Sequence, residues 1–425
     1  MTLEGLAGPA VAWLAAGYAV AAAWISRRAS PGPAPACEAA DSASIRPVSV
    51  LKPLCGAEPH LYENLATLCR QQHPAYQIVF GVRAADDPAI GVVERLRADF
   101  PACEIDLVID PRVHGSNLKA SNLINLCASA RHAWLVVADS DIAVAPDYLA
   151  RVTAPLADAR VGVVTCLYRG HPVGGFWSRL GAGFIDHWFA PSVRIAHAGG
   201  SRSFSFGATI ALRRDALAAI GGFEALSNRL ADDFWLGELV RRQGLETVLS
   251  DEMVTTDVTE SRLVDLWAHE LRWMRTIRSL NPAGFAFTFI TFTWPMLALA
   301  AWISPQPLVL AAVVMGGLAR SFLAGGLGAT LMAPLRDTLL LVEWAVALAG
   351  SQVRWRDRIL PVRDPPAADA PLQPRAPAAR AGMEPYQGAG VTLRPLPLMT
   401  EGTDNGVPER QSSRSKNGLN PPRLL

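Results

Sequence analysis

Two aspartates, Asp139 and Asp141, stand one residue apart at the end of the apolar run 133–138. Side chains at positions i and i+2 of a strand point the same way, and two carboxylates on one face repel each other unless a cation lies between them. Hard divalent ions bind a few carboxylates together with substrate phosphates. The pair therefore predicts a metal site that faces a phosphorylated substrate, with a solvated turn as the alternative.

Two further polar motifs precede this pair in the chain. Asp86 and Asp87 lie before a proline, a composition typical of a turn, but carboxylates here could also recognise a nucleotide base or ribose. Asn117 could cap a helix that begins at the next residue, and Lys119 within that helix could meet a phosphate. Each motif alone favours the turn or the cap.

The adjacent carboxylates Asp232 and Asp233 begin a stretch with helical periodicity. Either could be a helix cap. Asp233 could instead be a general base that takes a proton from an acceptor hydroxyl. A helix N-terminus lowers the basicity of a carboxylate, whereas burial or a neighbouring carboxylate raises it.

Residues 267–275 predict an amphipathic helix close to a membrane. The tryptophans and arginines of this stretch suit an interfacial helix. Alternatively, Arg272 contacts a diphosphate and Trp273 lines an acceptor site.

The composition excludes several classes of protein. The chain has 425 residues, half of them hydrophobic, and a net charge of +1, which argues against nucleic-acid binding. The six cysteines show no C-x-x-C spacing, so neither a zinc site nor a redox motif is indicated. The glycine-rich nucleotide motifs and the G-x-S-x-G nucleophile elbow are absent from the sequence.

Apolar runs alternate with helical stripes between residues 47 and 280, which predicts one α/β domain. The expected strands are 48–51, 78–82, 105–109 and 134–138, and the expected helices are 61–68, 90–96 and 118–130. Ligands of open parallel sheets bind beyond the carboxyl ends of the strands, and the aspartate motifs follow such ends.

The remaining segments predict a membrane protein. Residues 6–25 are uncharged and long enough for a membrane anchor, and Arg27 and Arg28 place the α/β domain in the cytoplasm. Residues 283–304 and 308–331 could also span, although Arg320 interrupts the second, and we expect 339–350 to be interfacial or re-entrant. The predicted organisation is an anchor, a linker, a catalytic domain, C-terminal membrane segments and a disordered tail, over residues 1–28, 29–46, 47–280, 281–358 and 359–425.

The order and spacing of these motifs resemble the lipid-directed glycosyltransferases, and most closely the ceramide glucosyltransferase family. The stretches that carry the resemblance are 50–54, 86–90, 118–123, 206–209 and 213–215. Within that family the chain resembles the branch associated with bacterial hopanoid biosynthesis, through 61–65, 164–170 and 269–278.

The resemblance implies a GT-A fold, a UDP-sugar donor and Mg²⁺ or Mn²⁺. In the family pattern Asp87, together with Asp86 and Lys119, binds the nucleotide, and Asp139 and Asp141 bind the metal and the diphosphate. Asp233 is then the base of an inverting displacement, and Arg272 and Trp273 close the diphosphate and acceptor side. His269 departs from the family, which usually has Gln or Arg there, and Asp141 is a second departure because animal ceramide enzymes can lack it.

We therefore expect a multi-pass enzyme of the bacterial inner membrane that transfers N-acetylglucosamine from a UDP-sugar to a hopanoid polyol. Ceramide as acceptor with glucose as sugar is the first alternative. A polysaccharide synthase, a phosphoprenol glycosyltransferase and a non-catalytic lipid-binding scaffold are further alternatives.

Overall fold

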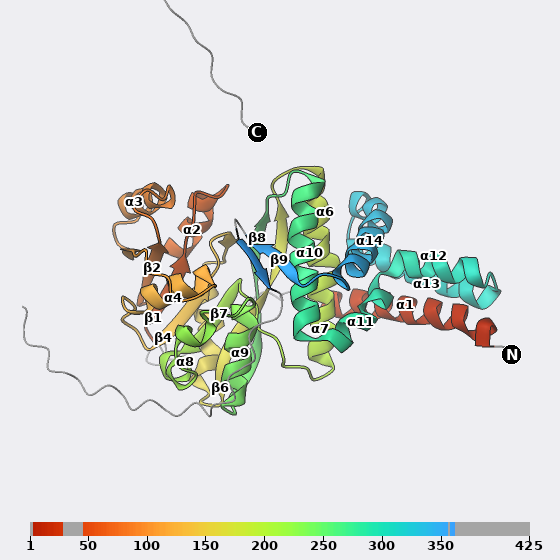
Figure 1. Ribbon diagram of the computed structural model, residues 1–425, viewed down its shortest axis with the longest axis horizontal. Helices are drawn as coiled ribbons and strands as arrows, with labels where there is room; N and C mark the ends of the chain where they lie inside the picture. Colours follow the sequence, from red (N-terminus) through yellow and green to blue (C-terminus); the bar gives the residue numbers. More distant parts are fainter. Residues whose placement is uncertain (1–2, 29–45, 356–357, 362–425) are drawn as a thin grey trace, which may run out of the picture. The chain divides into compact units, whose positions relative to one another are not determined.

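A mixed sheet of eight strands forms the centre of the α/β domain, in the order β3-β2-β1-β4-β7-β6-β8-β5 (Figure 1). The computed structural model describes residues 3–28, 46–355 and 358–361. The strands are β1 (Val48–Pro53), β2 (Tyr76–Val82), β3 (Glu104–Ile109), β4 (Trp134–Ala138), β5 (Ile142–Ala143), β6 (Val161–Pro172), β7 (Thr209–Arg213) and β8 (Glu246–Val258). All four expected strands are present, and the expected α/β fold class is confirmed.

The sheet is parallel only in part. β1 pairs in parallel with β2 and β4, and β2 with β3, as the alternation of strands and helices predicts. β7 is antiparallel to both β4 and β6, and β5 is antiparallel to β8. The four strands expected from the sequence are thus all parallel, as predicted, whereas the strands that follow them make the second half of the sheet mixed, with a long helical segment between β6 and β7.

Successive residues of the central strands are buried on opposite faces of the sheet. Val50 and Val136 belong to one hydrophobic cluster, whereas Leu51 and Val137 belong to the other. This alternation follows from the period of two along a strand, and burial on both faces explains why these strands are almost wholly apolar.

Helices cover both faces. The helices against the first cluster are α2 (Leu61–Cys69), α3 (Ala89–Asp99) and α5 (Tyr148–Thr153), the last followed by a 3-10 turn at Ala154–Ala157. Those against the second cluster are α4 (Leu118–Cys127), α8 (Arg214–Ala219) and α9 (Asp232–Arg242), with a 3-10 turn at Phe223–Leu226. The three-layer arrangement brings the starts of α4 and α9 to the edge where β1 and β4 end.

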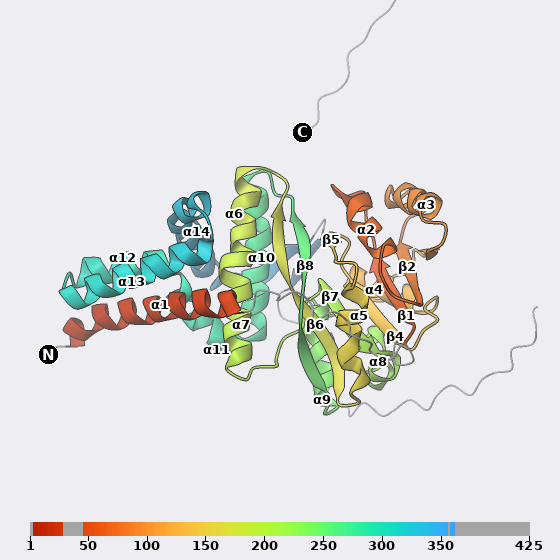
Figure 2. The same ribbon diagram turned by 180° about the vertical axis from the view of Figure 1, so that it is seen from behind.

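A second group of helices lies beside β6 and β8: α6 (Phe176–Phe184), a π-helical turn (Ile185–Phe189), α7 (Ala190–Ala198) and α10 (Leu263–Leu280) (Figure 2). The amphipathic helix expected at 267–275 is confirmed as part of α10. Its buried positions Leu266, Glu270 and Met274 are spaced four residues apart, so a charged residue interrupts the apolar stripe.

The apolar helices are α1 (Leu3–Arg28), α11 (Pro282–Phe287), α12 (Thr293–Ile303), α13 (Pro307–Ala324) and α14 (Leu327–Ala347), with a 3-10 turn at Thr288–Thr291. α1 lies along α12 and α13 (Figures 1 and 2). Within the described residues, Ala7–Arg28 and Pro307–Ala324 are long and apolar enough to cross a membrane. Pro282–Thr291 and Thr293–Ile303 pass that test only together, as a pair bent by 69°.

The expected membrane segments differ from these helices in two places. The segment 308–331 is wrong as a single helix, because Gly325 adopts a left-handed conformation, φ 75°, and ends α13. The short segment 339–350 is largely the second half of α14, which is 21 residues long and begins at Leu327.

The C-terminal part of the described chain is a short antiparallel pair, β9 (Gln352–Trp355) and β10 (Arg358–Pro361). The expected tail lies outside the described residues from residue 362 onward, as does nearly all of the expected linker.

Gly81 on β2 sets how closely α4 approaches the sheet. A Cβ there would overlap Asn122 Oδ1 and would lie 2.5 Å from Leu126 Cδ2. We expect Gly81→Ala to lower the free energy of unfolding by about 1–3 kcal/mol, as overpacking does. The measurement is thermal unfolding of the detergent-solubilised protein. Gly91→Ala on the exposed face of α3, where a Cβ meets nothing within 4 Å, is the control and should not destabilise. Equal melting temperatures for the two variants would contradict this account.

Candidate active site

The carboxyl ends of β1 and β4 open into a cavity of about 860 Å³. Asp139 follows β4 directly, and α4 and α9 supply side chains from their first turns. The cavity therefore brings together six of the residues predicted from the sequence: Lys119, Asp139, Asp141, Asp233, Arg272 and Trp273.

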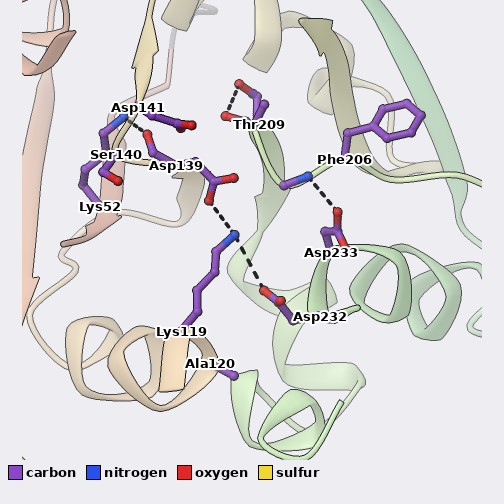
Figure 3. A network of polar contacts seen from close by, with 12 residues as sticks. Lys52, Lys119, Ala120, Asp139, Ser140, Asp141, Phe206, Thr209, Asp232 and Asp233 are labelled. Atoms are coloured by element: carbon purple, nitrogen blue, oxygen red, sulfur yellow. Dashed lines mark hydrogen bonds and ion pairs between the residues drawn. The ribbon is translucent and has the colours of Figure 1, made fainter. Parts of the chain in front are cut away.

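The ammonium group of Lys119 lies between carboxylates from two elements (Figure 3). Its Nζ is 2.5 Å from Asp139 Oδ1 and 3.8 Å from Asp232 Oδ2. Burial acts to lower the pKa of Lys119, but Asp139 and Asp232 outweigh it, so the pKa is raised above its ordinary value. Lys119 thus stays charged and balances part of the negative charge of the cavity.

Gly207 is the point where the charged groups converge. A Cβ at this position would lie 3.2 Å from Asp139 Oδ2, 3.2 Å from Lys119 Nζ and 3.4 Å from Asp233 Oδ2. The Gly207 backbone N–H donates to Asp233 Oδ2 at 2.9 Å (Figure 3). A Cβ here would be in tight contact with these groups, which would have to move by a few tenths of an ångström.

Two carboxylates of the cavity, Asp139 and Asp141, fit a divalent ion. Burial, then the neighbouring Asp139 and Glu58, raises the pKa of Asp141 to about 7. Within the described part of the chain, the hydrogen bond that Asp141 Oδ2 accepts comes from a neutral donor, Thr256 Oγ1, at 3.0 Å. A carboxylate that ionises with difficulty because a second carboxylate is near is stabilised by a cation bound to both.

Asp233 has the surroundings of a general base. Its pKa is raised to about 6, first by burial and then by the adjacent Asp232, against the opposing effect of Lys119. Asp233 Oδ1 accepts a hydrogen bond from the Phe234 N–H at 2.8 Å, so both oxygens are oriented by backbone donors. Ala231 rather than either aspartate is the N-cap of α9 and makes no side-chain cap, which removes the capping interpretation.

Asn117, in contrast, is the cap that the sequence predicts for α4. Its Oδ1 accepts from the Ala120 N–H at 2.9 Å, and its Nδ2 donates to Asp232 Oδ1 at 3.2 Å and to Arg229 O at 2.8 Å. The cap therefore joins the first turn of α4 to the first turn of α9.

α10 closes the other side of the cavity with Arg272 and Trp273. Burial lowers the pKa of Arg272, and the charge of Asp233 partly offsets this effect. The Trp273 ring packs on Phe184, with 5.2 Å between ring centroids. His269, the departure from the family pattern, hydrogen-bonds to Glu260 and lies edge-on to Trp273 at 4.4 Å, so its described contacts hold this wall in place.

Asp86 and Asp87 lie apart from this group. Among the described residues that line the cavity neither appears, and Asp86 is exposed. Asp87 Oδ1 accepts from the Gly56 N–H at 3.0 Å and from the Ala89 N–H at 2.9 Å. These bonds hold the loop after β1 and the start of α3, as in the turn interpretation, and a nucleotide role for the two aspartates stays a prediction.

Sequence reasoning gave no role to several residues in or beside the cavity. Lys52 is fully buried and its ammonium donates to the backbone oxygen of Asp139. Burial lowers the pKa of Lys52 to about 8. The sequence did contain a signal for Lys52, because a lysine inside an otherwise apolar strand indicates a charged group with a specific partner. Glu58 accepts a hydrogen bond from Ser140 Oγ at 2.8 Å, and Tyr168 lies close to the cavity aspartates. The places of Glu58 and Tyr168 depend on contacts between distant parts of the chain, which the spacing of residues in the sequence does not reveal.

A buried ion pair joins this cavity to the apolar helices. Arg336 of α14 donates to both oxygens of Glu270, at 2.9 and 2.7 Å, and to Glu343 at 3.3 Å. The side chains of Arg336 and Glu270 are 2% and 3% exposed. Since Glu270 lies two residues before Arg272, the pair fixes the helix that carries one wall of the cavity.

The sequence profile of Glycosyl transferase family 21 matches residues 9–368. The chain belongs to this family. It is 26% identical over 246 residues to ceramide glucosyltransferase 3 of Caenorhabditis elegans, covering 57% of this chain and 53% of the relative. It is 24% identical over 239 residues to ceramide glucosyltransferase 1 of the same organism, covering 55% and 50%. The match thus spans about half the length of these relatives.

Solved glycosyltransferases also resemble the chain. The mannosyltransferase PcManGT from Pyrobaculum calidifontis, in complex with GDP-Man and Mn²⁺, has a TM-score of 0.48 and 20% identity, covering 80% of this chain and 96% of that one. S. aureus TarS 1–349, in complex with UDP-GlcNAc, has a TM-score of 0.38 and 15% identity, covering 71% and 90%.

The ion pair between α10 and α14 predicts a large effect of Arg336→Met. Two buried carboxylates, Glu270 and Glu343, would lose their cation, which costs about 3–5 kcal/mol for a broken buried pair. We expect a clearly lower melting temperature in detergent. Arg160→Met, which removes an exposed arginine paired only with Asp158 in the described contacts, is the control and should leave it unchanged. Equal melting temperatures for the two variants would contradict a stabilising role for the pair.

Proposed function

We propose that this protein is a membrane-bound glycosyltransferase that moves a sugar from a UDP-sugar to a lipid hydroxyl by inverting displacement. The observation that carries the proposal is the convergence of Asp233, Asp139 and Lys119 around Gly207, in the cavity closed by Arg272. This brings a half-buried base beside the carboxylates that suit a metal-bound diphosphate. Membership of Glycosyl transferase family 21 supports the reaction class.

In the proposed reaction Asp233 accepts the proton of the acceptor hydroxyl as its oxygen attacks the anomeric carbon. The bond between that carbon and the diphosphate oxygen breaks, and UDP leaves with the electron pair. The N–H groups of Gly207 and Phe234 hold the carboxylate in place. Arg272 lies on the opposite wall, where a guanidinium can bind the departing diphosphate.

Asp139 and Asp141 would hold Mg²⁺ or Mn²⁺. When bound, the ion supplies a Lewis acid that neutralises the leaving diphosphate. Lys119 supplies one positive charge, which is not enough to neutralise all the aspartates at this end of the cavity. Negative charge therefore remains to bind the ion.

The acceptor side of the cavity is apolar. Trp273, Ile277 and Leu280 from the last turns of α10 line it, and α11 begins at Pro282. We propose that the lipid enters between this end of α10 and the apolar helices, at the cytoplasmic face of a bacterial inner membrane. Asp86 and Asp87 would lie at the uridine end.

For the acceptor we propose a hopanoid polyol, with N-acetylglucosamine as the sugar, from the resemblance of residues 269–278. Ceramide with glucose is the second candidate, because two relatives are ceramide glucosyltransferases. Purified protein would be assayed with both lipids and both UDP-sugars. Turnover of ceramide but not of the hopanoid polyol would overturn the first choice, and a long polymer from UDP-sugar alone would indicate a polysaccharide synthase instead.

We predict that Asp233→Asn lowers kcat by about 10²–10⁴-fold, because an amide cannot accept the proton. The melting temperature should change little. Glu238→Gln, a carboxylate-to-amide change on the same helix that contacts only Arg241 and Arg242 in the described ion pairs, is the control and should keep kcat. Unchanged turnover by Asp233→Asn would indicate another base, and absence of turnover in the wild type with every lipid and UDP-sugar tested would favour a non-catalytic scaffold.

The raised pKa of Asp233 predicts the acid limb of the pH profile. The base must be ionised, so kcat should be full above its pKa of about 6 and fall as the pH decreases through that value. The measurement is kcat at saturating donor and metal between pH 5 and 8. A kcat that stays constant through this range would show that the ionisation of Asp233 does not control the chemical step.

A further inference from the structure

We propose that His60, His171 and Asp257 form a second metal site, one that takes a transition-metal ion such as Zn²⁺. One ligand atom from each residue lies within 4.8 Å of the others. His60 precedes α2, His171 lies near the end of β6, and Asp257 near the end of β8. The three residues come from distant parts of the sequence, so their spacing gave no sign of a site.

The distances suit a small tetrahedral ion. Asp257 Oδ2 is 3.4 Å from His60 Nδ1, and Asp257 Oδ1 is 2.8 Å from His171 Nδ1. Ligands that each lie about 2.0–2.2 Å from zinc are separated by roughly 3.3–3.5 Å in a tetrahedron. Small rotations of the two rings would therefore bring both Nδ1 atoms and one carboxylate oxygen onto one ion, with a position left for water.

The charge at Asp257 also calls for a cation. Its side chain is only 4% exposed, and its ion-pair partners in the described part of the chain are the two imidazoles. Asn64 Nδ2 donates to Asp257 Oδ2 at 2.9 Å and orients the carboxylate, as an outer-shell residue does at metal sites. A carboxylate taken out of water is stabilised by a cation bound to it. The side chains of His60 and His171, 46% and 56% exposed, leave a path for an ion from solvent.

The ligand chemistry separates this site from Asp139 and Asp141. Imidazole nitrogens favour Zn²⁺ and its neighbours in the transition series, whereas carboxylates alone favour Mg²⁺ and Mn²⁺. The two sites would therefore take different metals from a mixture.

An ion here would fasten one wall of the cavity. The Asp257 N–H donates to the backbone oxygen of Asp141 at 3.1 Å, and the preceding Thr256 donates to the Asp141 carboxylate. Two residues before His60, Glu58 accepts from Ser140. Asp257 itself lines the cavity, and the ion would join these segments and hold the loop before α2 against β6 and β8.

The test is zinc binding by the full-length protein in detergent, free of any histidine tag. The metal-stripped protein is titrated with Zn²⁺ against a chromophoric chelator, in excess Mg²⁺ to occupy the carboxylate site. We expect one zinc equivalent for the wild type and at least about tenfold weaker binding for His60→Ala and His171→Ala, since even outer-shell changes cost 10–100-fold. His132→Ala, an imidazole outside the cluster, should bind as the wild type does.

His171→Asn distinguishes two possible roles of His171, zinc ligand and hydrogen-bond donor to Asp257. Asparagine can still donate a hydrogen bond to Asp257 but binds zinc poorly. Folding of each variant is checked by its melting temperature without metal. Loss of zinc binding in folded His171→Asn supports the site. Absence of a zinc equivalent in the wild type, or binding unchanged in both His60→Ala and His171→Asn, overturns it. The readout is metal binding, so its outcome does not depend on the proposed glycosyl transfer.

Discussion

The cavity at the end of β1 and β4 depends on one ion pair, between the half-buried ammonium of Lys119 and the carboxylate of Asp139. Asp139, Asp141, Asp232 and Asp233 crowd one end of the cavity, and without a fixed cation their mutual repulsion would protonate some of them or force them apart. Lys119 can serve both Asp139 and Asp232 because the cap at the start of α4 also holds the start of α9. The raised pKa of Asp233 and the affinity proposed for a divalent ion both follow from this incomplete balance of charge.

The rest of the fold keeps that cluster at the edge of the sheet. The parallel pairing of β1 with β4 places Asp139 where the strands end, and Gly207 lets Asp233 approach Asp139 and Lys119. On the opposite wall, α10 is held to α14 through Glu270 and Arg336. A hydrophobic acceptor could thus reach the same cavity that would take a water-soluble donor, because α10 both lines the cavity and packs against the apolar helix α14.

Short-range sequence patterns predicted the strands, the helix cap and the site residues that depend mainly on neighbouring positions in the chain. The apolar runs that became β1, β2, β3 and β4, the Asn117 cap, and the cavity aspartates Asp139, Asp141, Asp232 and Asp233 were evident from the sequence. Three features were not. The antiparallel β7 depends on a long excursion, the end of α13 depends on the left-handed Gly325, and the Glu270–Arg336 pair joins residues 66 positions apart. Asp87 was singled out by motif, yet its described bonds are those of a turn, because spacing cannot show where a side chain points.

The most direct test of the account is calorimetric titration of UDP in the presence of Mn²⁺ and in the presence of a chelator. The account predicts binding that requires Mn²⁺ and that weakens at least about tenfold in Asp141→Asn, since the ion loses one of its two carboxylate ligands. Asp147→Asn, an exposed carboxylate outside the cavity lining, should bind UDP as the wild type does. Equal UDP affinity with Mn²⁺ and with chelator, or an unchanged affinity in Asp141→Asn, would contradict a metal-held diphosphate at this site.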